Sequence, residues 1–269
     1  MGTLLKGKRI LITGLLAPSS LAFHIAGLAQ REGADIVVTG FGRMSLVERV
    51  AKKLPHPPPV LELDVRRPDH LERIATQVSA HLPALDGLVH SIAFAPPEAL
   101  GGDFSAAQWG AVADTLHVSA HSLASLTHSC LPLFEETGGS VVGIDFDGQL
   151  AWPDYNWMGV AKATLEATSR YLARQLGPRG TRVNLVAAGP IKSVAAQSFP
   201  GFDDLVAAWH SRASLGWDAT DPEPVARAVV ALLSDFFPRT TGEVVHVDGG
   251  FHAMGARHQG SAQTTGGKA

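Results

Sequence analysis

Short runs of apolar, mostly β-branched residues alternate with longer segments of helical periodicity along this 269-residue chain. We expect seven strands, at 9–13, 35–39, 60–63, 85–90, 140–145, 182–187 and 243–247. Six helical segments lie between them, at 20–32, 45–54, 68–80, 106–133, 155–176 and 222–234. Strands that alternate with helices form parallel sheets, because each crossover helix returns the chain to the same edge. The sequence therefore predicts one α/β domain, a Rossmann-like, doubly wound parallel sheet with helices on both faces.

Two segments interrupt the alternation. Residues 95–103 form a loop rich in Pro and Gly, and 191–217 make a long excursion with Gly and Pro near its middle. Both follow the carboxyl ends of predicted strands, where open α/β sheets bind their ligands. We therefore expect a dinucleotide-binding domain at 1–254 with a substrate lid near 191–217. The remaining segment, 255–269, is small, polar and Gly-rich, which is typical of a disordered tail.

The composition excludes several classes of function. A formal charge of −3 gives no net positive field for a nucleic acid or an anionic membrane. The single cysteine, Cys130, rules out an internal disulfide and favours a reducing cytosol. Without a signal-like N-terminus or a stretch of about 18 apolar residues, we expect a soluble, cytoplasmic protein.

Tyr155 and Lys162 stand seven residues apart in a predicted helix. Seven helical residues return to within about 20° of the same face after roughly 10.5 Å, so both side chains could face one site. A pair one turn apart would suit a phenol that protonates a carbonyl. The extra turn moves the hydroxyl outward, which favours a hydrogen bond to a thioester oxygen while hydride reaches a more distant carbon. The alternative is a pair of solvated residues on an exposed helix face.

The first strand leads to Gly14 and Ser20 without a complete G-x-G-x-x-G fingerprint. Gly14 would permit a sharp turn, and Ser20 would open a helix towards a pyrophosphate or act as a plain N-cap. No carboxylate follows the second strand. Phe41 could cover an adenine and Arg43 could reach a ribose phosphate, which leaves NADH and NADPH both open.

Later strand ends add further candidates. Asp64 and Val65 could grip the adenine edge, although an Asp before a helix is commonly a cap. The segment 90–94 would bring its backbone to the cofactor at the point where the strand order reverses. His117 and His121 share a helical face, but no Cys or Glu cluster completes a site, so we expect no metal.

An ordered set of motifs covers nearly the whole chain. They are Gly14 with Ser20, Thr39-Gly40-Phe41, Leu63-Asp64-Val65, His90-Ser91-Ile92, Asp145-Phe146-Asp147, Tyr155-Asn156-Trp157-Met158 leading to Lys162, Ala188-Gly189-Pro190-Ile191, and Val247-Asp248-Gly249-Gly250. With these motifs the chain resembles the enoyl-acyl-carrier-protein reductases of the short-chain dehydrogenase superfamily. The resemblance is strongest to the actinobacterial branch that serves long-chain and mycolic-acid synthesis.

The resemblance implies hydride transfer from NADH, with NADPH not excluded, to C3 of a trans-2-enoyl thioester. Tyr155 would stabilise the enolate oxygen and Lys162 would hold the nicotinamide ribose. Phe146 would pack beside the cofactor and guide the substrate. Carbonyl-reducing relatives carry a catalytic Ser there, and a Phe, which cannot donate a hydrogen bond, favours C=C over C=O reduction. The alternative for Phe146 is a plain core residue at a strand end.

The resemblance also implies two sets of contacts. Cofactor contacts would come from Gly14, Ser20, Leu21, Phe41, Asp64, Val65, Ser91, Ile92, Ala93, Val118, Ile144, Asp145, Lys162, Ala188, Gly189, Pro190, Ile191 and Ser193. Substrate contacts would come from Phe94, Phe146, Tyr155, Phe199, Phe202 and Leu205.

The expected substrate is an enoyl thioester on acyl-carrier protein or coenzyme A, and the expected assembly is a homotetramer. The segment 194–214 is shorter than the lid of long-chain reductases, which predicts acyl chains of medium length. Two alternatives stay open: a related reductase of secondary metabolism, and a cofactor-binding sensor without turnover.

Overall fold

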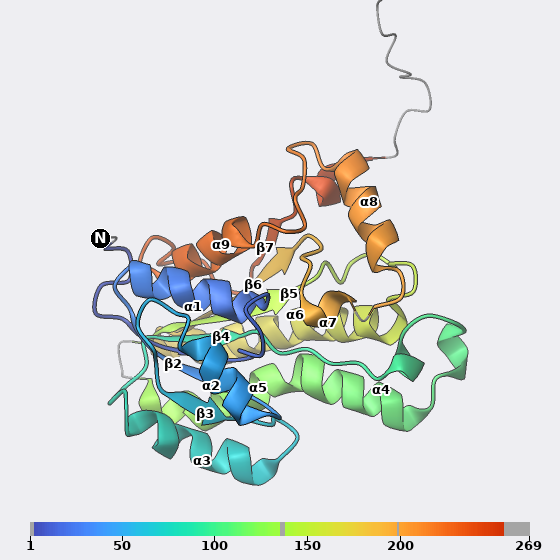
Figure 1. The fold of residues 1–269 in the computed structure, drawn as a ribbon. Coiled ribbons are helices and arrows are strands. Elements are labelled where there is room, and N and C mark those ends of the chain that lie inside the picture. The colour runs from blue at the N-terminus through green and yellow to red at the C-terminus, as the bar shows by residue number, and fades with distance from the viewer. Residues whose placement is uncertain (1–2, 135–137, 198, 256–269) are drawn as a thin grey trace, which may run out of the picture.

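The computed structural model describes residues 3–134, 138–197 and 199–255, and its centre is a seven-stranded parallel sheet (Figure 1). The strands are β1 (Arg9–Ile12), β2 (Asp35–Gly40), β3 (Val60–Glu62), β4 (Gly87–His90), β5 (Ser140–Asp145), β6 (Arg182–Ala188) and β7 (Val244–Val247). Their order across the sheet is β3-β2-β1-β4-β5-β6-β7, and each paired register is parallel. The predicted doubly wound sheet is confirmed.

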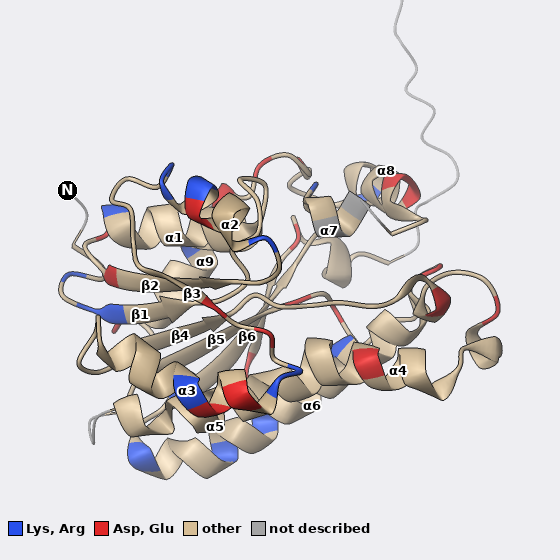
Figure 2. Ribbon diagram, turned by 60° about the horizontal axis from the view of Figure 1, so that its bottom comes forward, with Lys and Arg blue, Asp and Glu red and all other residues tan. Residues whose placement is uncertain are grey.

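Each face of the sheet has its own helical layer. Successive strand side chains point to opposite faces, so Ile10 and Ile12 join one core cluster while Leu11 joins the other. The first cluster packs under α1 (Leu21–Arg31), α2 (Met44–Ala51) and α9 (Glu223–Leu233). The second packs under α3 (Pro68–Ser79), α5 (Ser122–Cys130) and α6 (Asn156–Leu176). Figure 2 shows the two layers, with most Lys, Arg, Asp and Glu residues outside the sheet.

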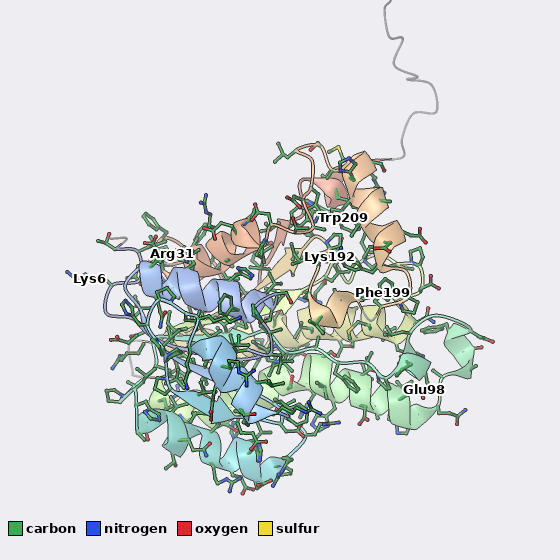
Figure 3. The ribbon with its side chains drawn as sticks, viewed as in Figure 1. Lys6, Arg31, Glu98, Lys192, Phe199 and Trp209 are labelled. Atoms are coloured by element: carbon green, nitrogen blue, oxygen red, sulfur yellow. The ribbon has the colours of Figure 1, made fainter. Side chains whose placement is uncertain are left out.

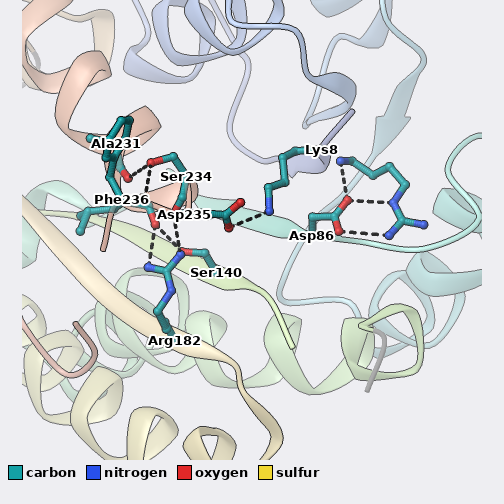
Figure 4. Close-up of polar contacts among 10 residues, drawn as sticks. Lys8, Asp86, Ser140, Arg182, Ala231, Ser234, Asp235 and Phe236 are labelled. Carbon is teal, nitrogen blue, oxygen red and sulfur yellow. Dashed lines mark hydrogen bonds and ion pairs between the residues drawn. The ribbon is translucent and has the colours of Figure 1, made fainter. Parts of the chain in front are cut away.

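Charged and polar contacts tie the amino ends of the strands together (Figure 4). The Arg9 Nε donates to Asp86 Oδ2 at 2.8 Å, which joins the starts of β1 and β4. Lys8 pairs with Asp235 at 2.8 Å, and Arg182 donates to the carbonyl oxygens of Leu232 and Ser234 at 2.8 and 3.0 Å. These contacts lie at the edge opposite the carboxyl ends, which leaves the carboxyl edge to the loops of the site.

The helix predicted at 106–133 is confirmed as a continuous helical run over 109–130, but its bounds and its regularity differ from the prediction. α4 (Trp109–Leu116) is followed by a π-helical turn, His117–His121, and then by α5. The Asp103 carboxylate accepts from the Ser105 amide and closes a separate 3-10 turn, so the helix starts only at Trp109. A π turn adds a residue to the helical repeat and changes which side chains face the sheet. Sequence periodicity cannot locate such an insertion.

The excursion at 191–217 is partly helical. It contains α7 (Val194–Gln197) and α8 (Phe202–Arg212), and α8 buries Phe202 and Trp209. The other helix and strand bounds differ from the predictions by at most three residues at an end. Apart from Gly255, the predicted tail lies outside the described residues. Among the helices described here, none is long and apolar enough to cross a membrane.

Candidate active site

The carboxyl ends of β1 and β4 approach each other closely at the point where the strand order reverses. Gly14 has φ +87°, and a Cβ atom built on it would lie 1.9 Å from the Ser91 carbonyl oxygen. The Thr13 hydroxyl donates to the Val89 carbonyl at 2.9 Å and holds the same two strands together. Only glycine fits this position, because it tolerates a positive φ and adds no side chain to the contact.

Ser20 occupies the N-cap position of α1 but does not cap the helix with its side chain. Its hydroxyl instead donates to the Ala17 carbonyl at 2.7 Å and stabilises the turn that precedes the helix. Ser20 is therefore the N-cap residue by position, but its side chain does not bond the first N–H groups of the helix. A helix start without a side-chain cap offers its first N–H groups to an anion, which fits a dinucleotide pyrophosphate.

Phe41 and Asp64, which follow adjacent strands, are joined by a residue that the sequence reasoning missed. The Arg66 guanidinium lies 5.6 Å from the centre of the Phe41 ring and 3.1 Å from Asp64 Oδ1. Although partial burial opposes it, the hydrogen bond from Arg66 lowers the pKa of Asp64. The Asp64 carboxylate also accepts from the Arg66 amide at 3.0 Å, so it closes a local turn. In the sequence, only the position of Arg66, two residues after Asp64, could have indicated that it belongs to the site.

The other predicted cofactor residues are distributed along the same edge. Leu21 begins α1, and Val118 is buried in the π-helical turn. Val65 is buried, Ile92 packs partly against the core, and Ala93 is exposed.

The backbone on both sides of Tyr155 adopts a left-handed conformation. Asp154 has φ 58° and Asn156 has φ 40°, and Asp and Asn tolerate this region better than other non-glycine residues. Gly101, in the loop after β4, binds both: its amide donates to the Asp154 carbonyl at 2.8 Å, and its carbonyl accepts from Asn156 Nδ2 at 2.5 Å. Strained backbone held by specific contacts is typical of functional positions. Tyr155 is the N-cap residue of α6, just before its first turn.

The Tyr155 phenol lies among aromatic rings. Its ring centre is 5.2 Å from that of Phe146 and 5.4 Å from that of Phe199. Burial, and secondarily the Asp145 charge, raises the pKa of Tyr155 above its ordinary value. The phenol is therefore neutral near pH 7 and can donate a hydrogen bond.

Lys162, on α6, is 5% exposed and lies beneath the end of β5. Its Nζ donates to the Ile144 carbonyl at 3.0 Å and is 3.8 Å from Asp145 Oδ1. Burial lowers the pKa of Lys162, and the Asp145 charge opposes that shift. Tyr155 and Lys162 thus contact three consecutive residues, 144–146, at one strand end.

Asp145 and His90 complete a buried ionisable cluster with Lys162. Burial raises the pKa of Asp145 to about 7, and neither carboxylate oxygen has a hydrogen-bond partner among the residues described. Burial, then the Lys162 charge, lowers the pKa of His90 to about 3, so its imidazole is neutral. Buried polar atoms without partners are uncommon in native proteins and are candidates for a ligand contact.

The turn after β6 runs beneath two indole rings. The Gly189 amide donates to the Val247 carbonyl at 2.9 Å, and Trp217 Nε1 donates to the Pro190 carbonyl at 2.8 Å. A Cβ at Gly189 would lie 2.7 Å from Trp217 and 2.8 Å from Trp209, so a larger residue does not fit. Ala188 and Ile191 are buried on either side of this turn. The Ser193 hydroxyl accepts from the Ala196 amide at 3.1 Å and holds the start of α7.

An aromatic cluster forms the opposite side of the site from Lys162. It comprises Phe146, Trp152, Tyr155, Trp209 and Phe251. Phe199 and Phe202 are buried, and Leu205 packs against the cluster. Figure 3 marks Trp209 on α8 and Phe199 ahead of that helix, beside the end of the sheet. Phe94, which was also predicted to contact the substrate, lies outside this buried cluster. The residue is 46% exposed, and its backbone is bound to the Ser119 hydroxyl.

The sequence reasoning did not assign Trp152 or Phe251 to the site. Phe251 follows the Val247–Gly250 motif directly, and that proximity is the one signal that could have identified it.

Comparisons with known proteins agree with this geometry. A family model described as "Enoyl-(Acyl carrier protein) reductase" matches residues 14–252. A protein of Mycolicibacterium smegmatis named enoyl-acyl-carrier-protein reductase (NADH) is 47% identical over 93% of this chain and 98% of its own length. A Mycobacterium avium protein of the same name is 45% identical over 93% and 98%. A Staphylococcus aureus relative, named for NADPH, is 36% identical over 93% and 98%. The chain therefore belongs to the enoyl-acyl-carrier-protein reductase family of the short-chain dehydrogenase fold.

Proposed function

We propose that this protein reduces the C2=C3 bond of a trans-2-enoyl thioester during fatty-acid elongation, with NADH as the reductant. The observation that carries this function is the end of β5, where Tyr155 and Lys162 approach consecutive residues and Phe146 offers no hydroxyl. A ketone reductase of this fold needs a second donor at that position, whereas an enoyl reductase needs an oxyanion donor alone.

The residues along the carboxyl edge fit a nicotinamide dinucleotide. Gly14 leaves room for a close backbone approach, and the start of α1 offers N–H groups to the pyrophosphate. Phe41, with Arg66 over its ring, provides a flat surface for adenine, and the Asp64 carboxylate lies on the other side of Arg66. The Ala188–Ile191 segment would border the nicotinamide. NADH is favoured by the names of the two mycobacterial relatives.

Each residue near the reacting carbons has a distinct task. When bound, the reduced nicotinamide supplies the hydride that reaches C3. The Tyr155 hydroxyl donates to the thioester oxygen, where negative charge develops, and its raised pKa keeps that proton in place. Lys162 holds the ribose hydroxyls and keeps a positive charge close to the phenol. The ring of Phe146 excludes water from this side, and solvent supplies the proton that C2 takes up.

Membership of this family supports a proposal for the substrate and the assembly. We infer an acyl chain of medium length, carried by acyl-carrier protein or coenzyme A, because 194–214 is a short lid. We also infer a homotetramer in the cytoplasm.

The direct test mixes the pure protein with NADH and either an enoyl thioester or a ketoacyl thioester. Loss of absorbance at the reduced nicotinamide band with the enoyl substrate alone is the expected result. Turnover of the ketone alone would overturn the assignment. Binding of NADH without turnover of either substrate would instead favour a sensor. Repeating the assay with NADPH tests the cofactor preference.

A further inference from the structure

The carboxyl group of Asp145 lies at the centre of the site and takes no part in the proposed hydride transfer. Its side chain is fully buried at the end of β5, and neither oxygen has a hydrogen-bond partner among the residues described. A buried carboxyl group without a partner is costly, because it has lost the hydrogen bonds that water would supply. An apolar side chain would fill the same space without that cost. Packing alone therefore does not account for an aspartate at this position.

The cation that faces Asp145 is the ammonium group of Lys162, whose Nζ is 3.8 Å from Asp145 Oδ1. This separation is too long for a hydrogen bond but short enough for an ionic interaction that is strong away from water. Nζ also donates to the Ile144 carbonyl at 3.0 Å, which uses one of its three hydrogens. The ammonium group is thus held against two consecutive residues of β5.

His90 faces the same cluster from β4 but carries no charge. The Ser122 hydroxyl donates to the Val118 carbonyl at 2.7 Å, so its oxygen accepts from His90 Nε2, also at 2.7 Å. His90 Nδ1 is then the unprotonated nitrogen, and it has no partner among the described residues. Burial and the Lys162 charge lower the pKa of His90 to about 3, which agrees with a neutral ring. His90 therefore neither balances the charge of Lys162 nor replaces it as a cation.

Three other ionisable groups act on Asp145 or respond to its charge: Glu166 on α6, Asp147 in the following loop and the Tyr155 phenol. Both carboxylates already have partners, an amide and a guanidinium for Glu166 and an imidazole for Asp147. The phenol is neutral, because burial raises its pKa. Within the described part of the chain, the charge of Asp145 is therefore the one that remains available to Lys162.

From this geometry we propose that Asp145 is a positioning residue for Lys162: its buried carboxylate keeps the ammonium group charged and fixes it at the end of β5. The inference rests on the proposed reductase function and adds the residue that maintains the charge of its lysine. Burial raises the pKa of Asp145 and lowers that of Lys162, whereas the charge of each residue opposes the shift in the other. Without the carboxylate, burial acts on Lys162 unopposed and favours the neutral amine.

The test measures kcat/KM and the dissociation constant of NADH from pH 6 to pH 9 in the wild type, Asp145→Asn and Asp235→Asn. At pH 6 the Asp145 carboxyl group is mostly protonated, so Asp145→Asn should stay within about threefold of the wild type. At pH 9 this variant should be at least about tenfold less active and should bind NADH more weakly, because its lysine has lost more of its charge.

The control removes a carboxylate that pairs with a lysine at the opposite edge of the sheet. Asp235 lies 2.8 Å from Lys8 and its side chain is 83% exposed, so Asp235→Asn should follow the wild type at every pH. The same pH dependence in folded Asp145→Asn and in the wild type would overturn the proposal. Asp145→Ser, which is smaller and also uncharged, provides the same comparison if the Asn variant does not fold.

A double-mutant cycle tests the pair without turnover. Melting temperatures are compared at pH 8 for the wild type, Asp145→Asn, Lys162→Met and the double variant. The change in the double variant should differ from the sum of the two single changes by at least about 3 °C, because the two groups interact directly. Additive changes in folded variants would overturn the proposal. A protein that reduces no enoyl thioester overturns the reductase function, and the cycle then still tests the pair.

Discussion

The two sides of Tyr155 differ in almost every physical respect. On one side lies the buried cluster of Lys162, Asp145 and His90, held by strand ends and the middle of α6. On the other side lie aromatic rings from a loop, from α8 and from the last turn of the described chain. The first side holds ionisable groups in fixed positions, and the second presents a rigid apolar surface. In the proposed function, the groups on the first side set the chemistry and the rings on the second side contact the substrate.

The largest expected effect comes from the charged side. Lys162→Ala should lower kcat/KM by about a thousandfold, because it removes the cation beside the phenol where negative charge develops. It should also weaken NADH binding, since the proposed function assigns Lys162 to the ribose hydroxyls. Steady-state kinetics and titration with NADH measure both effects. Lys53→Ala, at an exposed position, is the control and should behave like the wild type. Full activity in Lys162→Ala would contradict the assigned role.

Tyr155→Phe should lower kcat about a hundredfold, the usual cost of removing one donor to a developing oxyanion. NADH affinity should change by less than about twofold, because the phenol acts on the thioester. The control is Tyr171→Phe on the same helix, where the ring is 73% exposed. A loss of NADH affinity without a loss of kcat would reverse the roles of Tyr155 and Lys162.

The pH dependence of the stability of the protein should report the raised pKa of Asp145. Its pKa is about 7 in the folded chain against an ordinary 3.8, so the folded state holds the proton more tightly. The resulting stabilisation is complete below pH 3.8 and is lost as the pH rises to about 7. His90 acts with the opposite sign, since its pKa is lowered from 6.5 to about 3 and its contribution is lost as the pH falls.

Comparison with Asp145→Asn isolates the carboxyl group, because Asn does not titrate. The melting temperature of the wild type, relative to this variant, should fall by roughly 8–16 °C between pH 4 and pH 7, since each pKa unit is worth about 1.4 kcal/mol. A constant difference over that range would mean that Asp145 is ionised throughout. Thermal unfolding followed by circular dichroism provides the measurement.

The smallest effect is expected on the aromatic side. Arg212→Met removes the cation above Phe251, which is worth about 0.5–1 kcal/mol. The melting temperature should fall by about 1–4 °C. Arg227→Met, an exposed position on α9, is the matched control. An unchanged melting temperature in folded Arg212→Met would mean that this cation does not stabilise the Phe251 ring.

The same contrast explains what could be predicted from the sequence. The strands and the long helix follow from hydrophobic periodicity, so the positions of Gly14 and Asp145 at strand ends and of Lys162 on α6 could be predicted. Their roles came from the family resemblance. Trp152 and Phe251 lie in irregular segments about a hundred residues apart, and no period relates them. Arg66 was missed because its role depends on contacts with Phe41 and Asp64 across two strand ends. The π-helical turn was missed because local composition does not encode one inserted residue.

The double contact of Gly101 with Asp154 and Asn156 makes the loop after β4 and the start of α6 a single mechanical unit. An insertion or deletion at 95–103 would therefore disturb the backbone around Tyr155 through these two hydrogen bonds. Directed evolution of this site should therefore vary the two segments together.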